Sequence, residues 1–213
     1  YDTAIQLPTF TGNHDDGRFS TFVRKAFPNA SDAEVLQRVM LSNAMLLSLR
    51  GVPTIYSGDE QGFVSDGNDQ DAREDMFASK VASYNDNRLL GTSKTTATES
   101  FGQDNPLFRQ TAMLAKLRTA TPALTRGRQL LRAREDTPGL LAISRFDPTN
   151  GAEVLLAFNT STTPLTRQVE IGVGATGAKT LAGTGCGAVA APGSLTVTLP
   201  PLGYAICALT PAR

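Results

Sequence analysis

GVPTIYSGDEQG, residues 51–62, joins a helix end, a short apolar segment and two adjacent carboxylates. Gly51 follows a segment with helical spacing of apolar residues. It is a C-cap candidate because glycine accepts the left-handed backbone that ends many helices. Val52 to Tyr56 begins directly after it and predicts a short strand. Asp59 and Glu60 stand where that strand ends. The segment therefore predicts a helix that passes directly into a strand.

Upstream of Gly51 the pattern predicts that helix and an earlier strand. Ser31 and Glu34 form a capping box, in which Glu34 reaches back to the Ser31 amide. Apolar residues then recur at helical spacing up to Leu49. Residues 5–11 form a short, mostly apolar run that predicts a strand buried on both faces. Strand, helix and strand in this order indicate a parallel sheet with helices packed outside it.

Downstream, residues 58–104 form a polar stretch of a length that is usually functional. Asn105 and Pro106 then read as the N-cap and first residue of a helix that stops before Pro122.

From residue 125 the chain changes to short strands separated by turn sequences. The predicted strands are 129–134, 140–146, 153–159, 167–173, 195–199 and 204–209. This spacing favours an antiparallel β-sandwich. We therefore expect two domains, residues 1–124 and residues 125–213.

Composition argues against several classes of partner. The 213 residues hold 20 basic and 20 acidic side chains, so no basic surface for nucleic acid or for an anionic membrane is expected. Apolar runs are far shorter than the ~20 residues of a membrane span. The chain opens without the features of a signal peptide, and Tyr1 stands first in place of Met. We expect the sequence to be part of a longer chain.

Cys186 and Cys207 are the two cysteines, and both lie in the β-rich region. They could pair across neighbouring strands, which would indicate an oxidising compartment. Two buried reduced thiols are the alternative. We predict the disulfide and, with it, an extracellular or periplasmic location.

His14, the single histidine, stands beside Asp15 and Asp16 directly after a predicted strand. Ligands of parallel α/β folds bind at the carboxyl ends of the strands. An imidazole and a carboxylate there suit sugar hydrolysis, because a fixed carboxylate stabilises the positive charge that develops on the sugar ring. The alternative is a surface turn without such a role.

The other acidic residues favour structural roles. Asp59 and Glu60 are adjacent on a turn, where side chains usually diverge, so we interpret them as loop anchors. Residues 66–71 are weakly similar to a calcium loop, but they lack its glycine at position six and its glutamate at position twelve. We predict no cofactor and no metal ligand, and a structural calcium ion is an unsupported alternative.

Taken together, several segments resemble the α-amylase superfamily of (β/α)₈-barrel glycoside hydrolases. They are LPTFTGNHD at 7–15, like the end of the seventh barrel strand; residues 51–62, like the eighth; DQDAREDMF at 69–77, similar to an Asp-x-x-x-Arg-x-Pro-Met-x-Trp motif; and residues 117–127, like the end of the last barrel helix. The resemblance implies the last two βα units of a (β/α)₈ TIM barrel, followed by the family's C-terminal antiparallel β-sandwich.

By this resemblance, Asp15 is the catalytic aspartate that stabilises the transition state, and His14 donates a hydrogen bond to the sugar beside the cleaved bond. Asp69 and Arg73 bind the neighbouring sugar. The motif is incomplete, because an aspartate and a phenylalanine stand where the family usually has proline and tryptophan.

The resemblance also implies that the nucleophilic aspartate and the acid/base glutamate lie upstream, on the fourth and fifth strands. Retaining hydrolysis needs that pair ~5 Å apart. We therefore expect a retaining hydrolase of α-1,4 or α-1,6 glucosidic bonds, with an α-glucan or maltooligosaccharide as substrate, of which this chain is an inactive C-terminal part. A transglycosylase shares every motif and stays an alternative. A non-catalytic carbohydrate-binding module is disfavoured, because the three aromatic residues after 125 all fall in predicted strands.

Overall fold

The computed structural model describes residues 5–67 and 69–211. These residues form two compact units. The helical unit comprises residues 7–46 and 52–113, and the sheet unit comprises residues 5–6, 47–51 and 114–211. Two helices, α2 (Asp32–Ser48) and α4 (Pro106–Ala120), contribute residues to both units. These units are not the two predicted domains, 1–124 and 125–213, and that domain boundary stays a prediction.

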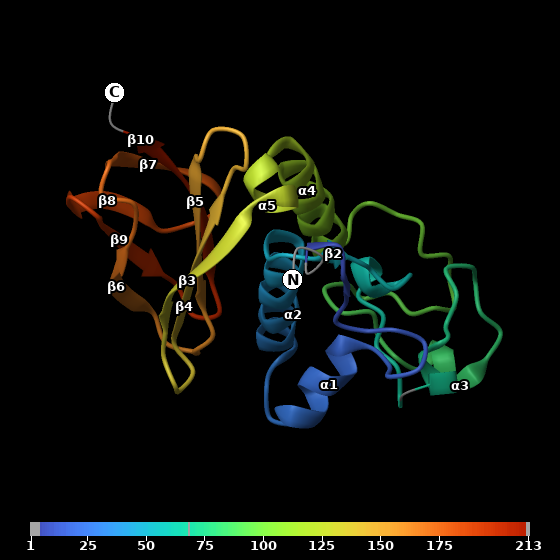
Figure 1. Ribbon diagram of the computed structural model, residues 1–213. Helices are drawn as coiled ribbons and strands as arrows, with labels where there is room; N and C mark the ends of the chain where they lie inside the picture. Colours follow the sequence, from blue (N-terminus) through green and yellow to red (C-terminus); the bar gives the residue numbers. More distant parts are fainter. Residues whose placement is uncertain (1–4, 68, 212–213) are drawn as a thin grey trace. The chain divides into compact units, whose positions relative to one another are not determined.

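Most of the helices lie in the first half of the described chain and most of the strands in the second (Figure 1). The remaining α-helices are α1 (Phe19–Ala26), α3 (Ala82–Asn85) and α5 (Pro122–Arg126), with 3₁₀ helices η2 (Asp59–Gln61) and η3 (Asp69–Ala72). The strands are β1 (Pro8–Thr9), β2 (Val52–Pro53), β3 (Arg128–Arg134), β4 (Leu140–Phe146), β5 (Glu153–Asn159), β6 (Leu165–Glu170), β7 (Ala175–Gly183), β8 (Cys186–Ala191), β9 (Ser194–Leu199) and β10 (Tyr204–Pro211). Among residues 5–67 and 69–211, no helix is long and apolar enough to cross a membrane.

In the helical unit, β1 and β2 pair in parallel, with Pro8 opposite Val52. This confirms the parallel arrangement that the strand–helix–strand order predicts. The predicted length and burial of the first strand are wrong, because β1 has two residues and the flanking Leu7 and Phe10 are 58% and 50% exposed. The physical reason is that this sheet has two strands in the described chain, too few to extend the hydrogen-bond ladder or to cover both faces.

The caps of α2 and α4 follow the sequence closely. Ser31 Oγ accepts a hydrogen bond from the Glu34 amide at 3.2 Å, and Asn105 Oδ1 accepts one from the Leu107 amide at 2.8 Å. The other half of the predicted capping box is wrong, because the Glu34 carboxylate accepts hydrogen bonds from Arg38 at 3.0 and 2.8 Å. A guanidinium one turn along the helix makes a stronger, charge-assisted bond than a backbone amide does.

A small apolar core holds the helical unit together. Its buried members are Val23, Val35, Val39, Val64, Leu90 and Leu107. Val23 belongs to α1, a helix that the sequence pattern did not predict. The members of this core come from α1, α2, the loop after η2 and the start of α4. The core therefore anchors the chain on both sides of the loop after η2.

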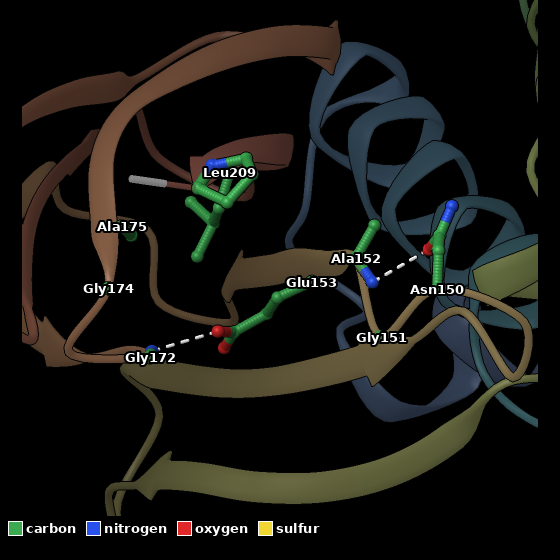
Figure 2. A pocket seen from close by; sticks show the side chains of 9 residues that line it. Asn150, Gly151, Ala152, Glu153, Gly172, Gly174, Ala175 and Leu209 are labelled. Carbon is green, nitrogen blue, oxygen red and sulfur yellow. Dashed lines mark hydrogen bonds between the residues drawn. The ribbon is translucent and has the colours of Figure 1, made fainter. Parts of the chain in front are cut away.

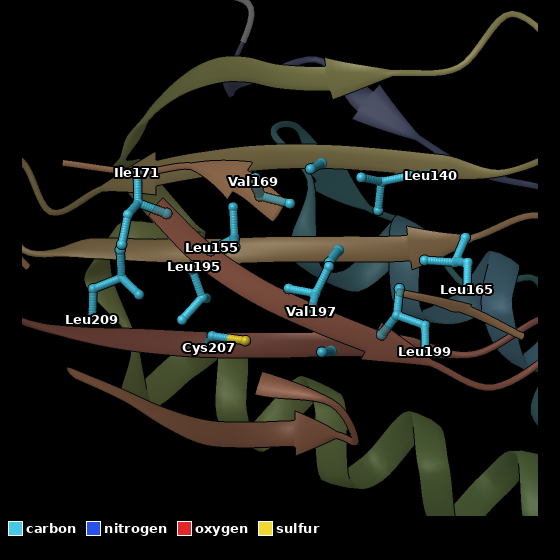
Figure 3. Packing of buried hydrophobic residues seen from close by; sticks show 13 residues of the cluster. Leu140, Leu155, Leu165, Val169, Ile171, Leu195, Val197, Leu199, Cys207 and Leu209 are labelled. Atoms are coloured by element: carbon cyan, nitrogen blue, oxygen red, sulfur yellow. The ribbon is translucent and has the colours of Figure 1, made fainter. Parts of the chain in front are cut away.

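The sheet unit consists of two antiparallel sheets. One has the strand order β3-β4-β5-β10-β7 and the other has the order β6-β9-β8. Leucine, isoleucine and valine side chains from both sheets meet in one buried cluster (Figure 3). The six predicted strands are present, and β6 runs from Leu165 to Glu170 where 167–173 was predicted. Strands β7 and β8 were not predicted.

A disulfide joins Cys186 of β8 to Cys207 of β10, with the two Cα atoms 5.8 Å apart. The predicted disulfide is present, and its two strands belong to different sheets rather than to one hydrogen-bonded pair. The bond instead links the two sheets through their common core, where Cys207 is fully buried. Covalent and hydrophobic contacts therefore hold the sheets together at the same place.

Two buried arginines of the sheet unit bind backbone carbonyls. Arg145 donates hydrogen bonds to the carbonyl oxygens of Ser48, Leu124 and Gly127 at 2.8, 3.1 and 3.1 Å. Arg118 donates to those of Leu47, Leu49 and Gly51 at 3.1, 3.0 and 2.6 Å. Burial lowers the pKa of Arg145 to about 10. Both guanidinium groups thus satisfy carbonyls at the end of α2, where the helix dipole favours positive charge.

Candidate active site

A tight turn between β1 and α1 carries His14 and Asp15. Asn13 and Gly17 close it through reciprocal backbone hydrogen bonds of 3.1 and 3.0 Å. The Asn13 side chain accepts hydrogen bonds from the amides of Asp15 and Asp16 at 2.7 and 2.8 Å. Gly17 has φ = +108°, a conformation that glycine adopts without steric cost. The backbone of Asp15 is therefore fixed, while its carboxylate projects from the turn and is 72% exposed.

Arg73 brings the predicted site residues together from two distant segments. Its Nη2 atom lies 3.7 Å from Asp15 Oδ1 and forms an ion pair with Asp69. Its Nε atom donates to the carbonyl oxygen of His14 at 3.4 Å. The His14 Nε2 atom lies 3.4 Å from Asp15 Oδ1. All four predicted site residues thus form one cluster, and their roles toward a ligand stay predictions.

The loop that carries Asp69 and Arg73 has its own supports. Asp69 has φ = +55°, in the left-handed region that Asp tolerates better than most residues. The Arg73 amide donates to the Gln70 carbonyl oxygen at 3.2 Å. The Tyr84 hydroxyl donates to the same oxygen at 3.0 Å. This loop is therefore held at η3, the turn from which both side chains emerge.

A fully buried arginine, Arg18, directly follows the turn in the chain. Its Nη1 atom lies 2.8 Å from Asp59 Oδ1, and its Nε atom lies 2.8 Å from Glu74 Oε2. Nη1 also donates to the Ser57 carbonyl oxygen at 3.0 Å. Asp59 therefore anchors a loop, as the sequence predicts, and Glu60 does so too by accepting a hydrogen bond from the Gly58 amide at 3.1 Å.

Aromatic rings complete the surroundings of Arg18. Its guanidinium carbon lies 4.5 Å from the centre of the Tyr56 ring and 4.8 Å from that of Phe63. Burial in this apolar setting raises the pKa of Asp59 to about 6, and attraction to Arg18 offsets only part of the effect. Sequence reasoning missed Arg18. No local motif marks it, since it occupies the N-cap of α1, a helix that the sequence pattern did not predict.

The described residues do not assemble a metal site. Among them, no group of three or more His, Cys, Asp or Glu side chains is placed to hold an ion. In the stretch that resembles a calcium loop, Asp66 accepts a hydrogen bond from Asn87 at 2.9 Å, and Asp69 is paired with Arg73. These carboxylates are engaged by side-chain donors.

A separate hollow of about 470 Å³ lies at one end of the sheet unit (Figure 2). Most of its lining residues are glycine, alanine, leucine or proline. Its one carboxylate, Glu153, accepts hydrogen bonds from the Gly172 amide and from Arg132, both at 2.8 Å. Ser144 also donates to Glu153. Since these donors already engage both oxygens of Glu153, this hollow offers little polar chemistry to a ligand.

Solved structures share the fold of this chain. An α-amylase from Anoxybacillus superposes on all of this chain with a TM-score of 0.73 at 23% identity, and the chain covers 40% of it. A γ-cyclodextrin glucanotransferase (γ-CGTase) from Bacillus clarkii gives 0.70 at 22%, again over all of this chain and over 27% of that enzyme. At these identities, the likeness shows a shared fold.

The family follows from sequence. The family model described as "Alpha amylase, catalytic domain" matches residues 2–141, so the chain belongs to the α-amylase family, which confirms the resemblance. An α-amylase of Streptomyces lividans is 46% identical over 160 residues, which are 75% of this chain and 17% of that protein. A cyclomaltodextrin glucanotransferase of Bacillus sp. (strain 1-1) is 36% identical over 108 residues, 45% of this chain and 14% of that enzyme. The chain thus spans less than a fifth of the curated relatives that it matches.

Proposed function

We propose that this chain is the C-terminal part of a retaining α-glucan hydrolase acting on α-1,4 or α-1,6 glucosidic bonds. Residues 1–124 would supply the last two βα units of a (β/α)₈ barrel, and residues 125–213 an antiparallel β-sandwich. The observation that carries the proposal is the cluster of His14, Asp15, Asp69 and Arg73, in which two segments distant in sequence meet. Membership of the α-amylase family supports it.

The cluster suits a polyhydroxylated substrate. The Asp15 carboxylate stabilises the positive charge that develops on the sugar ring, and the His14 imidazole donates a hydrogen bond to a ring hydroxyl. Asp69 and Arg73 offer an acceptor and several donors to the next sugar. The side chains of all four are about half exposed or more, so a maltooligosaccharide can displace the water around them.

The covalent step needs two further carboxylates. A retaining mechanism uses a nucleophile and an acid/base ~5 Å apart, and we assign this pair to sequence upstream of residue 1. Asp59 is not a substitute, because it is buried against Arg18. The chain by itself is therefore expected to be inactive.

Release of reducing sugar from soluble starch tests the proposal. The chain alone is expected to release none, and the chain joined to its upstream sequence is expected to be active. Asp15→Asn in the longer protein should lower kcat by about 10³-fold or more, since it removes the charge that faces the transition state. Asp16→Asn is the matched control on the same turn and should stay within a few-fold of wild type. Turnover by the 213 residues alone would overturn the assignment of the catalytic pair.

A transglycosylase is the second candidate, favoured by the similarity to a cyclomaltodextrin glucanotransferase. Such an enzyme would convert starch to cyclic or elongated glucans with little gain in reducing ends, so chromatography of the products separates the two activities. A carbohydrate-binding module is disfavoured. In the described chain after residue 125, the aromatic side chains of Phe146, Phe158 and Tyr204 are buried or half-buried, and none offers an exposed platform for a sugar.

We also propose an extracellular or periplasmic location, supported by the disulfide between Cys186 and Cys207. Alkylation of free thiols in protein taken directly from its native host, followed by mass spectrometry, tests this. Both cysteines should resist alkylation until the protein is reduced.

A further inference from the structure

We propose that Arg18 is a positioning residue of this active site, because it ties the turn that carries Asp15 to the loop that carries Arg73. The inference rests on the proposed function and extends it to a residue that touches no substrate. Arg18 follows directly on Gly17, the last residue of the turn, and its partner Glu74 follows directly on Arg73. A buried ion pair of 2.8 Å thus joins the immediate chain neighbours of both site segments.

A third contact fixes this pair to the sheet. Arg18 also binds Asp59 and the carbonyl oxygen of Ser57, both just beyond the end of β2. A guanidinium offers several donors in a rigid plane, so one side chain holds three segments in a single geometry. A lysine ammonium in its place is a compact charge without that planar arrangement.

The exposed cluster needs this support, because the side-chain contacts of Asp15 within it are long and solvated. The nearest atoms of His14 and Asp15 are 3.4 Å apart, and those of Arg73 and Asp15 are 3.7 Å apart. Ion pairs between such exposed groups contribute little to a fixed geometry. A displacement of 1 Å in a site of this kind costs on the order of 100-fold in rate. The buried contacts of Arg18 therefore set the distance between Asp15 and Arg73.

Gly12 shows how closely these parts fit. A Cβ atom at this position would lie 2.8 Å from the Gly17 carbonyl oxygen and 3.2 Å from Asp59 Oδ2. A side chain at Gly12, the residue before the turn, would therefore crowd both the residue that closes the turn and the carboxylate that Arg18 binds. The backbone beside the turn and the Asp59 carboxylate are thus close together.

The test uses the complete enzyme, with this chain joined to its upstream sequence, and measures kcat and KM on soluble starch. Arg18→Lys and Glu74→Gln should each lower kcat/KM by about 10-fold to 100-fold. Arg38→Lys is the matched control, because Arg38 also combines an ion pair, to Glu34 at 2.8 Å, with an aromatic ring, that of Phe27 at 3.7 Å. It should stay within twofold of wild type.

A double-variant cycle separates positioning from a general loss of stability. If Glu74 acts through Arg73, then Glu74→Gln should have little further effect on kcat/KM when Arg73→Ala is already present. Its effect on Tm should be the same in both backgrounds. Equal losses of kcat/KM in the two backgrounds would overturn the inference, and so would folded Glu74→Gln and Arg18→Lys enzymes within twofold of wild type. A wild-type enzyme that leaves starch unchanged would instead overturn the proposed function and the inference with it. If Arg18→Lys does not fold, the Glu74→Gln cycle decides.

Discussion

The carboxyl group of Asp59 lies in surroundings that act on it in opposite directions. Burial disfavours its charged form, and the neighbouring Arg18 favours it. Burial is the larger effect and raises the pKa to about 6. The nearby carboxylates of Glu60 and Glu74 contribute to this rise. In the unfolded chain this carboxyl returns to its ordinary value of 3.8.

This difference predicts a pH dependence of stability. Between about pH 4 and pH 6 the folded protein binds a proton that the unfolded chain has lost. The contribution of Asp59 to stability is therefore complete below pH 4 and is lost as the pH rises through 6. It amounts to about 3 kcal/mol at most. Asp59→Asn should reduce the change in unfolding free energy between pH 4 and pH 7 by up to that amount, as measured by urea unfolding of the complete enzyme. An unchanged pH profile would contradict the prediction.

Single functional residues could be predicted from the sequence where they stand in a short, recognisable motif. His14, Asp15, Asp69 and Arg73 were selected from short motifs, and the structure brings all four together. Arg18 could not be selected in this way. An arginine in a polar stretch usually indicates a solvated surface. Its burial depends on Asp59 and Glu74, which lie 41 and 56 residues away.

Among the elements, the end of α2 is held by side chains from far along the chain. Arg145 reaches the Ser48 carbonyl oxygen from β4, and Arg118 reaches the oxygens of Leu47 and Leu49 from α4. These carbonyls are among those that a helix leaves without an internal partner. Two guanidinium groups thus take the place of solvent at this helix end.

Replacement of Arg145 should therefore destabilise the protein. Arg145→Met leaves the carbonyl oxygens of Ser48, Leu124 and Gly127 without this donor, at a net cost of about 2–4 kcal/mol. Arg134→Met is the control. Its partner is Asp136, and both side chains are largely exposed, so the change should stay below about 0.5 kcal/mol. Thermal unfolding followed by circular dichroism measures both, and equal effects would sink the argument.

The elements that the sequence failed to predict have a common property. Strands β7 and β8 read ATGAKTLAG and CGAVAA, rich in glycine and alanine, which have low strand propensity. Their conformation comes from tertiary pairing, since β7 lies beside β10 and β8 beside β9. Helix α1 has eight residues and no capping side chain, so it too lacks a local signal. By contrast, β4 and β5 are strongly apolar, and their bounds match the prediction at both ends.

On the scale of the whole molecule, the sheet unit depends on contacts between its two sheets. The shared apolar cluster draws residues from β4, β5, β6, β9 and β10, and the disulfide closes a loop with a sequence separation of 21 residues. A cross-link of that span restricts the unfolded chain and stabilises the folded one by about 3 kcal/mol.

Loss of this bond is therefore predicted to lower the unfolding free energy by about 2–4 kcal/mol. The measurement compares the wild-type protein with the double variant Cys186→Ala, Cys207→Ala. The unfolding free energy of each is obtained by chemical denaturation under non-reducing conditions. A reducing agent should weaken the wild-type protein by a similar amount and leave the double variant unchanged. Equal sensitivity of the two proteins to the reducing agent would show that the effect comes from elsewhere.

The contacts around Arg18 also indicate where natural selection or laboratory evolution can work on this enzyme. The pairs of Arg18 with Glu74 and of Asp15 with Arg73 fall within two short segments, 13–18 and 69–74. Residues 75–104 contact these segments through the Tyr84 hydroxyl and pack on the core of the helical unit through Leu90. Insertions and exchanges at the exposed positions of that stretch should leave both short segments, and with them the reacting groups, in place. A library that diversifies the exposed positions of 85–104 and keeps the core residue Leu90 should therefore yield altered product profiles among variants that keep wild-type turnover.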